Sequence, residues 1–323
     1  MNEKRLWNEK RYHSFDSYLK TTFHRKLYKL SLNGGMTCPN RDGTLGTRGC
    51  IFCSEGGSGD FSANVALPIA DQIEEAKSLI SHKVRHDNKL TEPQYIAYFQ
   101  AFTNTYGSIT HLRKVFYEAI HHPDIAVLSI ATRPDCLDDE VIALLDELNH
   151  IKPVWIELGL QTIHERTVNL IRRGYSLSCY DEAVKRLHQV HIDVIVHLII
   201  GLPGETKEDI LETVRYVSSS GIQGVKLQLL HVIKNTDLAS IINQIHILTF
   251  EEYVTLIVTC LEHLDQNIVI HRLTGDGPKD LLLEPKWSTS KKLVLNSIQH
   301  AMKVNDSWQG KMNGGTLICN QKL

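Results

Sequence analysis

The sequence predicts an α/β protein in which a parallel β-sheet is covered by helices. Apolar, β-rich runs alternate about six times with amphipathic stretches of helical length, and this alternation is typical of sheets built from β-α units. Runs such as 194–200 are apolar almost throughout, which indicates strands buried on both faces. Residues of unusual chemistry follow the strands. Because the carboxyl ends of parallel strands meet at one rim, we expect a reactive site there.

The elements follow from runs of β-branched and aromatic residues and from apolar residues at helical spacing. Strands are expected over residues 27–32, 95–99, 125–131, 154–160, 194–200 and 224–230. Helices are expected over residues 71–85, 110–121, 138–150, 164–171, 179–191 and 207–219. After about residue 232 the alternation stops, and helices are expected near 249–264 and 288–302, with a short β run at 267–273 between them. We therefore divide the chain into a basic N-terminal segment (1–26), a β-α core (27–232) and a C-terminal helical extension packed against it (233–323).

Composition narrows the class of protein. The chain has 323 residues, of which 42% are hydrophobic and 22% charged, as expected for a protein with a sizeable core. A net charge of −2 excludes a uniformly basic nucleic-acid binder, although the N-terminal segment is rich in lysine and arginine. The N-terminus lacks the apolar core of a signal peptide, and no apolar run is long enough to span a bilayer. We therefore expect a cytoplasmic protein with no membrane partner and, given its odd number of cysteines, no structural disulfides.

Three cysteines form one group just after the first strand. Eleven residues separate Cys38 from Cys50, and two separate Cys50 from Cys53. Thiolates bind soft and borderline metals well. Three of them can hold three irons of a four-iron cluster and leave the fourth iron open as a reaction site. A fourth cysteine, the usual complement of such a cluster, is not nearby.

A zinc site is the main alternative for this group. A structural zinc needs four ligands, and His13, His24 or, less well, Glu55 could add one to the three cysteines. Spacing alone does not decide between iron–sulfur and zinc. The other cysteines, Cys136, Cys179, Cys260 and Cys319, are scattered singly, and we expect most of them to be small buried hydrophobes, while Cys319 could be an exposed thiol.

The residues around the cysteines resemble the radical S-adenosylmethionine (SAM) superfamily. Ile51-Phe52-Cys53 is similar to that superfamily's cysteine–aromatic–cysteine ending, and the long first gap is similar to the group around the Elongator catalytic subunit. Three segments resemble the bacterial YtqA/YhcC-type proteins: Cys38-Pro-Asn-Arg-Asp-Gly-Thr, Gly49-Cys-Ile-Phe-Cys-Ser and Gly57-Ser-Gly-Asp-Phe. The resemblance implies a partial (β/α)6 TIM-like barrel and an enzyme whose [4Fe–4S] cluster sits on Cys38, Cys50 and Cys53. It also implies that SAM binds the open iron and is cleaved to a 5′-deoxyadenosyl radical, which abstracts hydrogen from a substrate.

The same resemblance assigns SAM contacts along the strand ends. The assigned residues are Phe52, Ala101, Phe102, Thr103, Gln161, Arg173 and His197. Arginine suits a position near the SAM carboxylate because it makes paired hydrogen bonds. His197 stands where relatives often have aspartate near the nucleoside; a hydrogen-bonded core residue is the alternative.

Three departures from the family pattern stand out. Residues 100–102 lack the glycines with which relatives meet the SAM ammonium, and Ala131 replaces a glutamate in the run before Thr132-Arg-Pro-Asp. His197 replaces the usual aspartate. Near the C-terminus, Arg272 and Asp276 resemble residues that line the substrate mouth in the Elongator group, and a surface ion pair is the alternative.

Resemblance to the Elongator group implies a tRNA substrate, with the wobble-uridine side chain as the modified group, and an electron donor of flavodoxin or ferredoxin type. A small-molecule or protein substrate stays open. From a different class, the chain could be a zinc-stabilised RNA-binding protein without redox chemistry. The two classes differ in metal content and in SAM cleavage.

Overall fold

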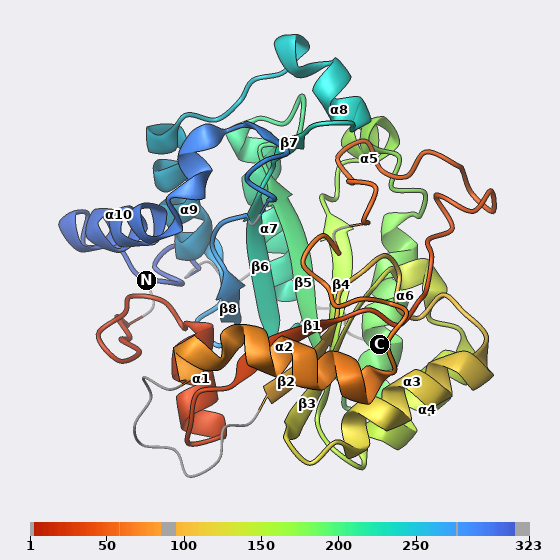
Figure 1. Cartoon of the computed structure of the whole chain (residues 1–323). Helices are drawn as coiled ribbons and strands as arrows, with labels where there is room; N and C mark the ends of the chain where they lie inside the picture. Colours follow the sequence, from red (N-terminus) through yellow and green to blue (C-terminus); the bar gives the residue numbers. More distant parts are fainter. Residues whose placement is uncertain (1–2, 58, 85–94, 276, 314–323) are drawn as a thin grey trace, which may run out of the picture.

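The computed structural model describes residues 3–57, 59–84, 95–275 and 277–313. Within these residues, one sheet has seven strands that lie in chain order from one edge to the other. Its strands are β1 (Tyr28–Leu32), β2 (Tyr95–Phe99), β3 (Ile125–Thr132), β4 (Val154–Gln161), β5 (Asp193–Ile200), β6 (Gly224–Leu229) and β8 (Val269–Arg272). Every neighbouring pair is parallel. The sheet is curled into a half-barrel, which confirms the predicted partial-barrel class (Figure 1).

Helices cover the outer face of the sheet (Figure 1). They are α2 (Ile69–Val84), α3 (Ile109–His121), α4 (Asp139–Asn149), α5 (Glu165–Ile171), α6 (Leu177–Gln189), α7 (Lys207–Ser219), α9 (Phe250–His263) and α10 (Lys291–Val304), with a 3-10 turn, η1 (Pro134–Cys136), after β3. Most begin with a serine, threonine or aspartate cap, and Thr206 and Asp209 form the capping box of α7. No helix in the described part of the chain is both long and apolar enough to cross a bilayer.

The part of the chain beyond residue 232 contributes to the sheet itself. The expected β run at 267–273 is strand β8, which pairs in parallel with β6 through Gly224 and Val269. Helix α9 packs on α7 and α10, and its Tyr253 and Leu261 belong to the main apolar core. A two-stranded antiparallel ribbon, β7 (Val232–Ile233) with β9 (Leu282–Glu284), and the short elements α8 (Asp237–Ser240), η2 (Ile242–Gln244) and η3 (Lys286–Thr289) complete this part.

The N-terminal segment closes the amino ends of the strands. It contains a helix that the sequence patterns did not indicate, α1 (Phe15–Thr22), capped by Ser14. Ser14 bridges in parallel to Ile270 of β8, and the Phe15 ring stacks on His271 at 4.3 Å and meets Trp155 edge-on at 5.8 Å. Aromatic rings of the described residues thus fill the amino end of the half-barrel, and its cavity lies at the carboxyl ends of the strands.

Candidate active site

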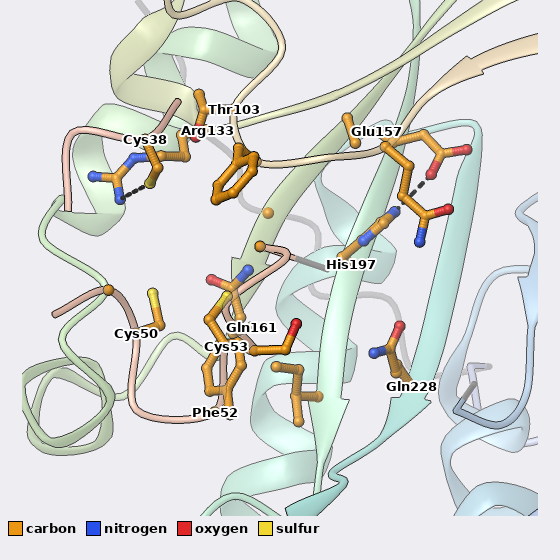
Figure 2. A pocket seen from close by; sticks show the side chains of 18 of the residues that line it. Cys38, Cys50, Phe52, Cys53, Thr103, Arg133, Glu157, Gln161, His197 and Gln228 are labelled. Atoms are coloured by element: carbon orange, nitrogen blue, oxygen red, sulfur yellow. Dashed lines mark hydrogen bonds and ion pairs between the residues drawn. The ribbon is translucent and has the colours of Figure 1, made fainter. Parts of the chain in front are cut away.

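A cavity at the carboxyl ends of the strands brings most of the predicted residues together (Figure 2). Its lining includes the three cysteines and, of the predicted SAM contacts, Phe52, Phe102, Thr103, Gln161, Arg173 and His197. Ala101 is not in the lining; it is buried behind the cavity, with 1% of its surface exposed. The cysteines lie at one side and Glu157, His197 and Gln228 at the other (Figure 2).

The cysteine loop is shaped by short-range hydrogen bonds. The Cys53 amide donates to the Cys50 carbonyl at 3.0 Å, and this tight turn brings the two sulfurs into contact. The Cys38 carbonyl accepts from the amides of Arg41 and Asp42 at 2.8 and 3.2 Å. Gly49 lies between the two turns with φ +72°, a left-handed conformation that glycine adopts at low cost. The loop therefore presents all three thiols to the cavity.

Asn40 fastens this loop to the connection between α5 and α6. Its buried amide nitrogen donates to the carbonyls of Arg172 and Arg173 at 2.7 and 3.2 Å and lies 3.5 Å from the Cys50 sulfur. On the other flank, the Arg133 guanidinium forms a two-point pair with Asp135 and lies 3.8 Å from the Cys38 sulfur. Donors aimed at thiolate sulfurs stabilise their negative charge, as around bound iron–sulfur clusters.

The donor set fits a cluster better than a single zinc ion. The neighbouring Cys53 and burial raise the pKa of the Cys50 thiol well above its ordinary value, and a bound metal would favour its thiolate form. In a tetrahedral zinc site with Zn–S bonds of about 2.3 Å, the sulfurs lie roughly 3.8 Å apart. Cys50 and Cys53 are in contact, but among the described residues the three sulfurs do not form a set within 4.8 Å of one another, so Cys38 stands apart from the other two.

The proposed fourth zinc ligands lie elsewhere. The His13 ring stacks on Trp7 at 5.5 Å, and its Nδ1 lies 3.3 Å from the Asn267 carbonyl. His24 and Glu55 are exposed, and neither belongs to the cavity lining. Of the remaining cysteines, Cys136 and Cys179 are half-buried and Cys260 is buried, while Cys319 lies outside the described residues.

In the loop after β2, Phe102 has the left-handed backbone conformation that glycine usually adopts. Phe102 has φ +59°, which costs a non-glycine residue on the order of 1 kcal/mol. Its amide donates to the Gly57 carbonyl at 2.9 Å, and a Cβ on Gly57 would come within 2.2 Å of the Phe102 ring. A Cβ on Gly59 would likewise meet the Ala101 side chain at 2.5 Å. The glycines missing from residues 100–102 are thus matched by glycines in the cysteine loop.

Gln161 and Arg173, two predicted SAM contacts at and after the end of β4, are fixed by different hydrogen bonds. Gln161 takes φ +64° and its side-chain oxygen accepts from the Tyr175 hydroxyl at 3.1 Å, which fixes the amide beside the cavity. Arg173 has 1% of its surface exposed and donates to the carbonyls of Leu160, Thr162 and Tyr175 at 2.7–3.2 Å. Arg173 therefore braces the β4–α5 loop, with its positive charge at the cavity wall.

Glu157 is the centre of a buried charge network in the half-barrel. Its carboxylate, 1% exposed, pairs with the ammonium groups of Lys29 and Lys226. It also accepts from the Ser129 hydroxyl at 2.9 Å and lies 2.9 Å from His197 Nε2. Burial alone would raise the Glu157 pKa, but Lys226, Lys29 and His197 hold it well below its ordinary value. The group is therefore ionised at neutral pH.

His197 is hydrogen-bonded to Glu157, as the alternative of a hydrogen-bonded core residue predicted, and it also lines the cavity. Its contact with SAM stays a prediction. Burial and the nearby Lys226 charge lower its pKa from 6.5 to about 4, despite the opposing effect of Glu157. The ring is therefore neutral at pH 7. Because Nε2 donates to the carboxylate, Nδ1 is left as an acceptor.

Sequence reasoning missed Glu157, Lys226 and Lys29 as parts of the site. Their signal was present: Glu157 and Lys226 interrupt the apolar strands 154–160 and 224–230, and charged residues are almost never fully buried unless paired. Arg272, predicted at the substrate mouth, does line the cavity, and its Nη1 donates to Gln228 at 3.4 Å. Its predicted companion Asp276 lies outside the described residues.

Comparisons with known proteins agree on one family. The model of the radical SAM superfamily matches residues 43–217, and that of the Radical_SAM C-terminal domain matches residues 222–304. YtqA of Bacillus subtilis (strain 168) is 42% identical over 305 residues, covering 94% of this chain and 93% of YtqA. YhcC of Escherichia coli (strain K12) is 34% identical over 276 residues, covering 84% of this chain and 86% of YhcC.

Two further likenesses are more distant. The tRNA-2-methylthio-N(6)-dimethylallyladenosine synthase of Vesicomyosocius okutanii subsp. Calyptogena okutanii (strain HA) is 24% identical over 212 residues, covering 64% of this chain and 47% of the synthase. The solved structure of archaeal Methanocaldococcus infernus Elp3 has the same fold, with a TM-score of 0.65 at 17% identity, covering 88% of this chain and 64% of Elp3.

Proposed function

The chain belongs to the radical SAM superfamily, and on that premise we propose that it is a radical SAM enzyme acting on tRNA, with its [4Fe–4S] cluster on Cys38, Cys50 and Cys53. The observation that carries the proposal is the set of three thiols at one side of a cavity whose far side is a polar barrel interior. When bound, the cluster supplies the electron that cleaves SAM to a 5′-deoxyadenosyl radical. The electron comes from a donor of flavodoxin or ferredoxin type.

The chain's own residues bind and orient SAM in this proposal. Phe52 and Phe102 cover the cofactor with apolar surface, and the backbone of 101–103 meets the SAM ammonium. Gln161 offers its amide, which Tyr175 already fixes. Arg173 places a positive charge near the SAM carboxylate while its N–H groups brace the loop. His197 offers Nδ1 as an acceptor to the nucleoside.

Support for a tRNA substrate comes from two sides. The motifs Thr132-Arg-Pro-Asp and Glu157-Leu-Gly-Leu-Gln resemble the Elongator group, and the distant synthase relative is named for its action on tRNA. The cavity also contains the side-chain amide of Gln100. Amides pair donors and acceptors with base edges, as required for reading an unstacked uracil. We propose the wobble-uridine side chain as the modified group.

The cluster proposal is tested by anaerobic reconstitution. We expect about four irons and four sulfides per chain, and 5′-deoxyadenosine when SAM and a reductant are added. The Cys50→Ala variant should lose both, whereas Cys260→Ala, which removes a thiol far from the cavity, should retain both. Colourless protein with one tightly bound zinc would establish the RNA-binding alternative instead.

The substrate proposal is tested by nucleoside mass spectrometry on tRNA from a strain that lacks this protein. We expect a wobble-uridine nucleoside to be replaced by its precursor, and wild-type protein but not Cys50→Ala to restore it. An unchanged nucleoside profile, together with intact SAM cleavage in vitro, would point to a small-molecule or protein substrate.

A further inference from the structure

The wall of the cavity opposite the cysteines carries an arginine that forms no ion pair with any residue that the structure describes. Arg272, at the end of β8, is half-buried and lines the cavity, and Gln228 of β6 lies beside it. Its Nη1 donates to the Gln228 side-chain oxygen at 3.4 Å, which leaves most of the guanidinium N–H groups open. In the part of the chain that the structure describes, Arg272 forms no ion pair. Figure 2 shows Gln228 on this wall, across from the cysteines.

The charges behind this wall do not balance. Two ammonium groups, Lys29 and Lys226, pair with one buried carboxylate, Glu157, and Arg272 lies close by without pairing with it. Both Glu157 oxygens are already occupied by Lys29, Lys226, Ser129 and His197. His197 adds no negative charge, because its ring is neutral at pH 7. Burial lowers the pKa of Lys226 well below its ordinary value, but Lys29 and Arg272 alone already outnumber the single carboxylate, so the network has excess positive charge. Of these basic groups, Arg272 is the one that lines the cavity.

Excess positive charge in a secluded site is unfavourable unless an anion joins it. A charge that is withdrawn from water without a partner is unfavourable. The Arg272 charge also reaches its neighbours: burial is the larger cause, but Arg272 adds to the lowering of the pKa values of Lys226 and His197. An anion against Arg272 would offset the excess. Arginine's planar fork matches carboxylate and phosphate oxygens in two-point hydrogen bonds.

We propose that Arg272 and Gln228 form a subsite for an anionic group, a carboxylate or a phosphate, of the substrate. Arg272 donates from its fork, and Gln228, whose oxygen faces Arg272, donates from its amide nitrogen. The charges of Lys226 and Lys29 strengthen the subsite from behind. This inference rests on the proposed enzyme activity and deepens it, because it assigns the substrate's charged group to the β6–β8 wall and SAM to the cysteine side.

The test is anion binding to anaerobically reconstituted protein with saturating SAM and no reductant. The probes are acetate and inorganic phosphate, titrated calorimetrically at constant ionic strength set with chloride. We expect wild-type protein to bind one of them, and the probe that binds identifies the class. Arg272→Gln should weaken binding on the order of tenfold or more, the usual effect of losing a charge-assisted hydrogen bond. Arg272→Lys should retain part of the affinity.

Two further variants keep the test decisive. Gln228→Glu should abolish anion binding and raise the melting temperature, because the new carboxylate pairs with Arg272. Arg215→Gln removes the same charge from an exposed pair with Glu208 on α7 and should bind the probe like wild type. If Arg272 only stabilised the fold and bound no anion, Gln228→Glu would bind the probe as tightly as wild type.

Several results would overturn the subsite. They are undetectable binding of both probes, equal affinity in wild type and Arg272→Gln, unaltered binding in Gln228→Glu, or binding that SAM itself displaces, which would assign the wall to SAM. Failure of the proposed activity gives a different pattern: no cluster and no SAM cleavage, with Arg272-dependent anion binding retained.

Discussion

At the scale of single residues, Glu157 determines what the interior of the half-barrel can be. A carboxylate that is 1% exposed among strands is tolerable only because Lys29, Lys226, Ser129 and His197 surround it. These partners come from four different strands. Glu157 thereby ties together the inner faces of the sheet beneath the proposed SAM site.

Glu157→Gln should therefore destabilise the protein strongly. It keeps the shape of the side chain but leaves two ammonium groups without a counter-charge, and breaking a buried pair in this way costs about 3–5 kcal/mol. Urea unfolding at pH 7 measures the change. As a matched control, Glu182→Gln removes an exposed carboxylate 3.6 Å from Lys185 and should change stability by less than about 1 kcal/mol. Equal effects of the two substitutions would contradict the network.

His197 makes stability depend on pH. Its folded-state pKa is about 4, whereas its ordinary value is 6.5. Between these values the unfolded chain binds a proton that the folded chain does not, so stability falls as pH decreases from about 6.5 to 4. The loss is on the order of 3 kcal/mol.

His197→Gln, which keeps a donor for Glu157 but does not titrate, should flatten this part of the profile. Urea unfolding at pH 7, 6 and 5 measures it in both proteins. Burial also lowers the pKa of His271, and His197 adds to that lowering, so the comparison reports His197 together with its effect on His271. Parallel profiles for the two proteins would show that His197 does not titrate as described.

The sequence indicated this site unevenly at the residue scale. The cysteines, Gln161 and Arg272 could be placed at the cavity because their motifs follow strand ends. The partners of Glu157 could not be identified, since pairing between β1, β4 and β6 depends on the curl of the sheet. The hydrogen bonds of Arg173 could not be predicted either, because its acceptors are backbone carbonyls, which a pattern of side chains does not indicate.

At the scale of elements, two loops have adapted to each other. The cysteine loop supplies Gly57 and Gly59 where the loop after β2 supplies Phe102 and Ala101. From the sequence, the loss of glycines at 100–102 suggests a lost contact. In the structure, Phe102 instead has the left-handed backbone conformation. Gly57 and Gly59 of the cysteine loop leave room for the Phe102 and Ala101 side chains.

A double-mutant cycle tests this coupling. Gly57→Ala should lower thermal stability and iron content after reconstitution, because its Cβ would lie 2.2 Å from the Phe102 ring. Gly43→Ala is the control: it also has a positive φ, +96°, but nothing within 4 Å of an added Cβ, so only the backbone cost of about 1 kcal/mol applies.

Adding Phe102→Gly to Gly57→Ala should recover much of the loss, since it removes the ring that the new Cβ meets. Recovery shows as a coupling energy that the two single variants do not predict by addition. Strictly additive effects would mean that the two loops do not constrain each other.

At the scale of the whole molecule, the alternation of strands and helices was sufficient to predict the parallel sheet. It was not sufficient to predict that β8 joins the sheet beside β6 or that helix α1 forms. Strand β8 is only four residues long and follows a helix in a region without β-α rhythm, so its place beside β6 depends on long-range packing. Helix α1 packs against the amino ends of the strands through Phe15, a contact that no local pattern reveals.

The N-terminal segment covers the amino ends of the strands, and the cysteine loop lies at their carboxyl ends. The aromatic plug of the N-terminal segment, the charged interior around Glu157 and the cavity above it follow each other along the strands. A substrate of the proposed enzyme would enter from the carboxyl end of the sheet, where Arg272 and Gln228 line the cavity. The central claim is that three cysteines leave one iron of a cluster open to SAM.

Electron paramagnetic resonance of the reduced, anaerobically reconstituted protein tests that claim most directly. Spectra are recorded before and after the addition of SAM. The account predicts the signal of a reduced [4Fe–4S] cluster whose g-values shift when SAM is added, because SAM binds the open iron. A cluster signal that is identical with and without SAM, or a protein with one zinc and no such signal, would contradict it.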